Sequence, residues 1–133
     1  VVFQIHMSPK TVDGEISRAI SERFGFHVDV VCRTKKQLES VLAHDPFGKV
    51  ASDDSKYVIA FMPTPPRAAA VKPVLAGEYP GGELCALKGR EFYVWTPNGV
   101  SKSKSLEAFG KAKPVDYVTV RNVRTVKKII DLL

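Results

Sequence analysis

The run from Tyr57 to Met62 is almost entirely apolar, and it constrains the fold more than any other stretch of the sequence. A strand with apolar side chains on both faces needs a layer of structure on each side of its sheet. We therefore predict a central strand here, covered on both faces. A length of 133 residues and a hydrophobic content of 44% are enough to build such a core.

Strand-like and helical stretches alternate along the rest of the chain. Apolar runs bounded by turn residues predict further strands at residues 1–7, 26–32, 83–87, 90–95 and 116–120. Apolar residues at helical spacing, with cap residues before them, predict helices at residues 8–24, 34–43, 102–111 and 122–133. Pro73 is expected to confine the segment 67–76 to short helical pieces.

This order is β-α-β-α followed by β-α-β-β-α-β-α, and its second part is that of a ferredoxin-like unit. The predicted fold class is α+β, with two ferredoxin-like α/β subdomains of which the first is incomplete. The polar loop 48–55 marks the expected boundary. We assign residues 1–52 to a partial N-terminal subdomain and residues 53–133 to a C-terminal subdomain with an extra terminal helix.

Cysteine usage and hydropathy limit the class of protein. Cys32 and Cys85 lie in separate apolar runs, which is typical of free buried thiols in a reducing cytoplasm, although the sequence leaves a disulfide open. No cysteine or histidine has another close by at the spacing of metal ligands, so we predict no metal, and no cofactor is indicated. No run approaches the roughly 20 apolar residues of a membrane span.

The formal net charge is +6, and the excess is concentrated near the C-terminus. From Gly99 onward, eight lysines and arginines stand against three acidic residues. A basic segment of this kind attracts phosphates or nucleic acid over a Debye length of roughly 10 Å. The sequence leaves open whether the segment is such a binding surface or an ordinary solvated face.

The stretch from Leu87 to Ser105 combines a strand, an exposed turn and the capped start of a basic helix. Helix-start amides, serine hydroxyls and lysine ammonium groups would converge there beside an aromatic strand. The predicted anion-binding residues of this stretch are Asn98, Gly99, Ser101, Lys102, Ser103 and Lys104. The spacing GxxxxGK[ST] of a Walker loop is missing, and a plain strand-to-helix turn is the alternative interpretation.

A second polar cluster stands at the start of the last predicted helix. Arg121 could clamp an anion through its planar guanidinium, and Asn122 supplies a cap. We expect the two helix beginnings to meet at one concavity, although a surface arginine beside an N-cap explains the same residues. Tyr93 and Trp95 are interpreted as core rather than as a nucleic-acid stacking platform, because the aromatic signature of RNA-binding sheets is absent.

Four stretches of the sequence resemble one known family, the domain of unknown function 1697. They are VVFQI at Val1–Ile5, the segment Ile16–Phe47, GREFYVWTPNGVSKSK at Gly89–Lys104, and the segment Val118–Leu133. The resemblance implies two loosely ferredoxin-like α+β subdomains in a bacterial-type cytosolic protein, and it implies no established activity. Family members usually begin with a strand, a basic loop containing glycine and a helix, so we expect this chain to be an N-terminally truncated member.

Three functions follow as hypotheses. The first is a module that binds a polyanion, either nucleic acid or a phosphorylated ligand, through the basic C-terminal part of the chain. The second is an enzyme that acts on a phosphate-bearing small molecule, and the third is self-association through an exposed sheet edge. The sequence does not decide whether the protein is an enzyme, and it leaves the oligomeric state open.

Overall fold

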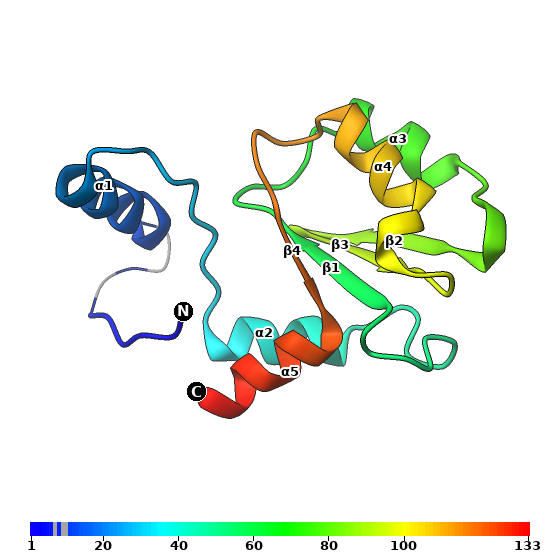
Figure 1. Ribbon diagram of the computed structural model, residues 1–133, viewed down its shortest axis with the longest axis horizontal. Coiled ribbons are helices and arrows are strands. Elements are labelled where there is room, and N and C mark those ends of the chain that lie inside the picture. Colours follow the sequence, from blue (N-terminus) through cyan, green and yellow to red (C-terminus); the bar gives the residue numbers. More distant parts are fainter. Residues whose placement is uncertain (7, 9–10) are drawn as a thin grey trace.

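A four-stranded antiparallel sheet lies at the centre of the computed structural model, which describes residues 1–6, 8 and 11–133 (Figure 1). Its strands are β1 (Tyr57–Phe61), β2 (Leu84–Lys88), β3 (Glu91–Trp95) and β4 (Thr119–Asn122). They lie in the order β2-β3-β1-β4, so the central position predicted for β1 is confirmed. All five residues of β1 are buried, because helices cover both of its faces.

Two pairs of helices cover the two faces of the sheet (Figure 1). The described helices are α1 (Val12–Phe24), α2 (Lys35–Ala43), α3 (Ala68–Ala76), α4 (Lys104–Ala112) and α5 (Val123–Leu132), with short 3-10 turns η1 (Pro80–Gly82) and η2 (Val100–Lys102). We call the first pair the α3/α4 layer and the second the α2/α5 layer. Helices packed on an antiparallel sheet give the molecule an α+β architecture, as predicted.

Side chains of the two central strands alternate between these layers, because consecutive residues of a strand point to opposite faces. Val58 and Ala60 pack against the α3/α4 layer. In the same layer Phe92 of β3 stacks on Phe109 of α4, with ring centroids 4.3 Å apart. The α2/α5 layer packs against the intervening residues Tyr57, Ile59, Phe61, Tyr93 and Trp95. The core is therefore divided into two clusters by the sheet itself.

Cap residues fix where several helices begin and end. Thr34 forms a capping box at the start of α2, as its place before the apolar repeat predicted. Ser103 and Asn122 each accept the backbone N–H of the third residue in α4 and α5, at 3.2 and 2.8 Å. Gly25 ends α1 with a φ of 76°, a conformation that favours glycine. Each cap satisfies a backbone group that has no partner inside its helix.

The two strands predicted near the N-terminus are wrong within the described residues. Residues 1–6 and 26–32 form no strand; residue 7 of the first prediction lies outside the described part. A strand needs a neighbouring strand, whereas the backbone here bonds to side chains. The Ser17 hydroxyl donates to the Val28 carbonyl at 2.7 Å, and the Cys32 N–H donates to the Asp13 carboxylate at 3.1 Å. These bonds tie the segment after α1 back onto that helix.

Further differences from the predictions concern α3, β4 and α1. α3 runs unbroken through Pro73, so the expected short pieces are wrong. The carbonyl that this proline leaves without a helix donor belongs to Ala69, which is exposed to solvent, so water can satisfy it. β4 begins at Thr119 rather than at residue 116, because its pairing with β1 starts there, opposite Phe61. α1 begins at Val12, and the predicted start at residues 8–9 lies partly outside the described residues.

Candidate functional site

The predicted anion-binding loop leaves the end of β3 and leads into α4 (Figure 1). Gly99 turns the chain with a φ of 101°, which a residue with a side chain rarely adopts. Asn98 lies so close to Gly81 of η1 that a Cβ there would collide with its amide. Asn98, Ser101 and Lys102 are exposed, so the loop presents polar groups to solvent.

The first amides of α4 are not free, because the carboxylate of Glu83 occupies them. The Lys104 N–H donates to one Glu83 oxygen at 2.8 Å, and the Ser105 N–H donates to the other at 3.3 Å. The hydroxyls of Ser103 and Ser105 donate to that second oxygen at 2.7 and 2.5 Å. Four donors at the positive end of a helix therefore surround one internal carboxylate.

This environment changes the acidity of Glu83. Partial burial alone would raise the pKa of the carboxyl group, but the hydrogen bonds from Ser105, Ser103 and the two amides outweigh burial and hold the pKa below its ordinary value. The group is therefore charged at neutral pH and is itself an anion at the helix start. Ser103 and Lys104 thus engage an internal anion, and their role toward an external one stays a prediction.

The second predicted cluster lies where β4 passes into α5. The Asn122 side-chain oxygen accepts the Thr125 N–H at 2.8 Å, and the Arg124 N–H donates to the Asp54 carbonyl at 3.2 Å. Arg121 is exposed, and its guanidinium donates to the carbonyl of the preceding residue at 2.7 Å. Within the described part of the chain no acidic side chain pairs with Arg121, so its remaining donors can receive an external anion.

The structure places the two helix beginnings at one end of the sheet but does not bring Arg121 to the start of α4. Both helix beginnings lie at the same end of the sheet, since Asn122 pairs with Val58 and Val58 pairs with Val94. The α3/α4 layer, however, covers the face of Val58, whereas Arg121 lies opposite Ile59 and therefore on the face of the α2/α5 layer. The sheet separates Arg121 from the start of α4.

Tyr93 and Trp95 belong to the core, as predicted. Their exposed fractions are 2% and 7%, and the Tyr93 hydroxyl donates to the Val41 carbonyl of α2 at 2.8 Å. Tyr57 meets the Trp95 ring edge-on, with centroids 6.5 Å apart. The α2/α5 layer thus covers the face that a nucleic acid would need for base stacking, and this pair cannot serve as a stacking platform.

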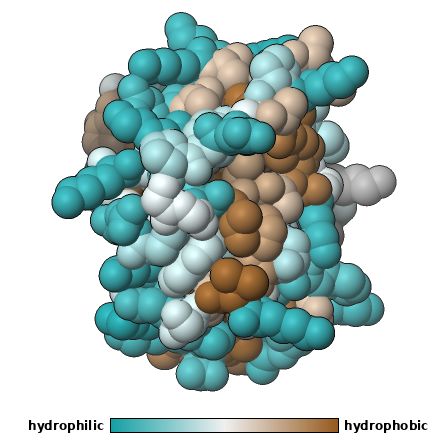
Figure 2. All heavy atoms as spheres, turned by 90° about the vertical axis from the view of Figure 1, so that its right-hand side faces the viewer, coloured by the Kyte–Doolittle hydropathy of each residue, from teal (hydrophilic) through white to brown (hydrophobic). Residues whose placement is uncertain are grey.

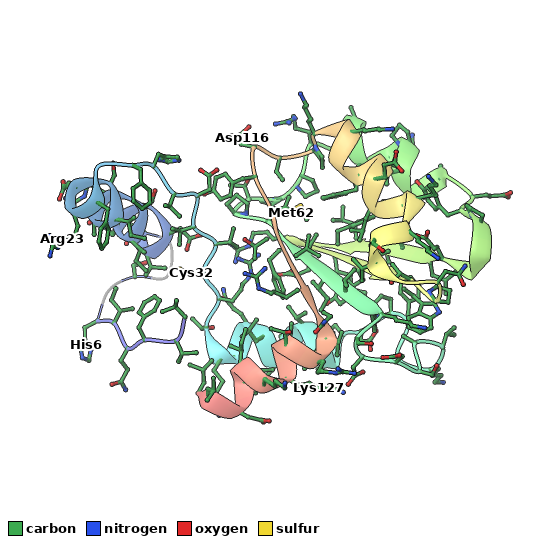
Figure 3. All side chains as sticks on the ribbon, in the orientation of Figure 1. His6, Arg23, Cys32, Met62, Asp116 and Lys127 are labelled. Atoms are coloured by element: carbon green, nitrogen blue, oxygen red, sulfur yellow. The ribbon has the colours of Figure 1, made fainter. Side chains whose placement is uncertain are left out.

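The α2/α5 layer and the end of β4 carry six exposed cations. We define the basic face as the exposed residues Lys35, Lys36, Arg121, Arg124, Lys127 and Lys128. Lys127 lies on the side of α5 that faces away from the sheet, and its ammonium pairs with the Asp54 carboxylate at 2.7 Å (Figure 3). The other five cations form no ion pair within the described residues. The two acidic side chains on these helices are Glu39 and Asp131.

A cavity of about 460 Å³ lies next to this face, between the N-terminal segment and the α2/α5 layer. Its lining is largely apolar, and Arg121, Lys35 and Arg33 add cationic groups. The Arg33 side chain is only 4% exposed, and the Glu91 carboxylate holds its guanidinium at 2.9 Å. Arg121 and Lys35 are therefore the exposed charges of the lining. No local sequence signal indicates this cavity, because its walls come from both ends of the chain.

The described residues also bear on the predictions about cysteines, metal binding and membrane spans. Cys32 and Cys85 are both free, and burial together with a hydrogen bond to Asp13 raises the pKa of Cys32 to about 11. Among the described residues, no three histidine, cysteine or acidic side chains gather in a way that could hold a metal ion. None of the described helices has the length and hydropathy needed to span a bilayer.

Comparison with known proteins gives one family. Residues 1–93 match the family described as "Protein of unknown function (DUF1697)". The match contains β1, β2 and most of β3, together with α1, α2 and α3. It ends before the loop 98–104 and before β4 and α5. No curated protein and no solved structure matches the chain.

Proposed function

The chain belongs to the DUF1697 family of proteins of unknown function, and we propose that it binds polyanions through the basic face. The proposal rests on exposed cations that are not paired with an acidic side chain and can therefore attract an external anion. Of the six cations on this face, Lys127 forms an ion pair, and the other five have no acidic partner among the described residues. A phosphate that approaches them displaces no internal carboxylate, so its attraction is not offset by a broken pair.

The shape of α5 suits a ligand with several phosphates. Lys127 and Lys128 follow Arg124 by three and four positions, so each lies next to Arg124 on the helix surface. Val123 and Val126 of the same helix pack into the core. Four residues of helix rise about 6 Å, so Arg124 and Lys128 form a short row along the axis. A row of separated charges favours repeated phosphates, as in a nucleic acid, over one isolated phosphate.

The other predicted residues take a subsidiary role in this proposal. Asn122 caps α5 and holds the helix that carries the cations. The exposed groups of Asn98, Ser101 and Lys102 lie at the same end of the sheet and could contact one further phosphate around its end. The amides of α4 stay with Glu83, so the loop is not expected to bind an anion as a closed cradle.

The proposal is tested by fluorescence anisotropy with a labelled single-stranded oligonucleotide of mixed sequence at 50 mM salt. Replacing Arg124 and Lys128 with glutamine should weaken binding at least tenfold, because two phosphate contacts are lost. The matched control replaces Lys72 and Lys111 with glutamine, which removes the same charge from the α3/α4 layer. The proposal fails if the native chain does not bind at low salt, or if the control weakens binding as much.

The hypothesis of an enzyme that acts on a phosphate-bearing small molecule draws support from the cavity beside Arg121. Its volume of about 460 Å³ is within the range of small-molecule sites. Arg121 and Lys35 would hold the phosphate and the apolar lining would hold the rest of the ligand. A thermal-shift screen of nucleotides and sugar phosphates tests this alternative, since a bound ligand raises the melting temperature. A screen without any stabilising compound would count against it.

We also propose a finer description of the architecture. The element order β1-α3-β2-β3-α4-β4 and the strand order β2-β3-β1-β4 support a ferredoxin-like unit, followed by α5 as an extra helix. We keep the division into a partial subdomain 1–52 and a C-terminal subdomain 53–133 as a proposal, although α2 packs with α5. The cytoplasmic location also stays a prediction.

A further inference from the structure

Strand β2 is an open edge of the sheet. It pairs with β3 on one side, and no described residue forms a backbone hydrogen bond with its other side. Such an edge presents a row of unpaired N–H and C=O groups that can receive another strand. The opposite edge, β4, differs because it carries Arg121 and ends at Asn122, whose side chain caps α5.

The pairing register identifies the open groups of β2. The Thr96 N–H donates to the Lys56 carbonyl at 2.9 Å, so even-numbered residues at this end of β3 direct their backbone groups toward β1. The odd-numbered residues of β3 therefore face β2, and they pair with its even-numbered residues. Cys85 and Leu87 are left with backbone groups that point outward. Each of these two residues offers one N–H and one C=O to an incoming strand.

The surroundings of this edge are apolar. Figure 2 faces the right-hand side of Figure 1 and shows a band of hydrophobic surface between hydrophilic margins. Exposed apolar side chains come from three elements, namely Leu75 of α3, Leu84 of β2 and Val100 of η2. β2 contains no proline, and its one charged residue is Lys88, at its end. The features that usually protect an edge strand are therefore few.

We propose that β2 pairs antiparallel with β2 of a second copy of this chain, around a twofold axis through Ala86. In this register Cys85 of one copy lies opposite Leu87 of the other. The two outward-facing residues of each strand then exchange four hydrogen bonds across the axis, so the row of open groups complements itself. The sheets of the two copies become continuous. The inference is independent of the basic face and goes beyond polyanion binding.

Two features favour a second copy in this orientation: the distance it leaves between like charges, and the fact that both strands are ordered before they pair. Antiparallel pairing separates the two Lys88 residues by four positions along the strand, roughly 13 Å, which exceeds a Debye length of about 8 Å at physiological salt. Parallel pairing would bring the two ammonium groups side by side. Both strands are already ordered by their own sheets, whereas a disordered peptide would lose backbone freedom on binding.

Cysteine crosslinking tests the register directly. In a Cys32→Ala, Cys85→Ala background, Ala86→Cys would place two thiols across the twofold axis, where non-hydrogen-bonded partners have Cα atoms about 4.5 Å apart. Leu84→Cys is the matched control, since it lies on the same face but roughly 13 Å from its symmetry mate. Mild oxidation should give a covalent dimer with Ala86→Cys and little with Leu84→Cys. Equal crosslinking of the two variants, or none, would overturn the proposal.

Sedimentation equilibrium under reducing conditions tests the association without a crosslink. A short strand pair with flanking apolar contacts is at the small end of specific interfaces, so we expect a Kd on the order of 1–100 μM. Cys85→Pro removes an outward N–H without breaking the pairing with β3, and it should weaken the dimer at least tenfold. Cys85→Ala keeps the N–H and is the control. A native chain that stays monomeric up to about 1 mM, or a folded Cys85→Pro dimer of unchanged affinity, contradicts the proposal.

Discussion

The two helical layers differ in what happens to their positive charge. In the α3/α4 layer, Lys104 and Lys111 both pair with Glu107, and the start of α4 holds the Glu83 carboxylate. Of the three lysines on these two helices, Lys72 alone has no acidic partner among the described residues. In the α2/α5 layer, five of the six cations of the basic face have no acidic partner among the described residues. A net charge of +6 therefore does not locate a binding surface by itself, because neighbouring carboxylates decide which charges are available.

The largest expected effect concerns packing in the α3/α4 layer. Phe109→Ala should lower the free energy of unfolding by about 3–5 kcal/mol, because it removes the ring stacked on Phe92 and leaves a cavity. Urea denaturation measures the loss. Phe24→Ala is the control; Phe24 is 64% exposed, and the expected change is within about 0.5 kcal/mol. A loss below about 1 kcal/mol for Phe109→Ala would show that packing does not hold this layer.

The next largest effect tests whether the Glu83 carboxylate stabilises the start of α4 by accepting its hydrogen bonds. Glu83→Ala should lower the free energy of unfolding by about 1–3 kcal/mol, because the hydroxyls of Ser103 and Ser105 and two amides lose their acceptor. Glu78→Ala removes an exposed carboxylate from the preceding loop and serves as the control. If the two variants unfold at the same urea concentration, the hydrogen bonds between Glu83 and the start of α4 do not contribute to the free energy of unfolding.

The same carboxylate predicts a pH dependence. The pKa of Glu83 is lowered in the folded state, so its contribution to stability is present above the unfolded value of about 4.3 and is lost as the pH falls through the folded value. The difference in unfolding free energy between the native chain and Glu83→Gln should shrink steadily from pH 5 downward. Urea denaturation at several pH values measures it. A difference that grows as the pH falls would contradict the account.

The smallest effect concerns the start of α5. Asn122→Ala should cost about 1 kcal/mol of stability, because the Thr125 N–H loses its cap. Asn122→Asp keeps an acceptor at the same place and should restore most of this loss. The comparison with Glu83 then shows whether one neutral cap contributes less than an internal carboxylate with four donors. Thermal unfolding by circular dichroism separates the three proteins.

Local patterns in the sequence predict much of the sheet and of the helices that pack on it. The apolar run predicted β1, and the caps Thr34 and Asn122 predicted the starts of two helices. The predicted N-terminal strands failed because strand formation depends on a partner that local pattern does not reveal. Local patterns also do not predict contacts between residues that are far apart in the sequence. Glu83 meets α4 across about 20 residues, and Arg33 meets Glu91 across 58.

The candidate site was predicted only in part for the same reason. The residue types of the loop 98–104 indicated an anion site, but the sequence could not show that Glu83 would supply the anion. Arg121 lies on the sheet face that the α2/α5 layer covers, because it pairs opposite Ile59. Only the assembled sheet determines that register. The distribution of acidic partners over the two layers is likewise a property of the fold.

Nuclear magnetic resonance of the 15N-labelled chain, titrated with a single-stranded oligonucleotide at low salt, tests the central claim most directly. The account predicts that the amide signals of Lys35, Lys36 and residues 121–128 shift first and furthest, while those of α3 and α4 change little. Shifts confined to residues 98–104, or spread equally over both layers, would contradict the assignment of polyanion binding to the basic face.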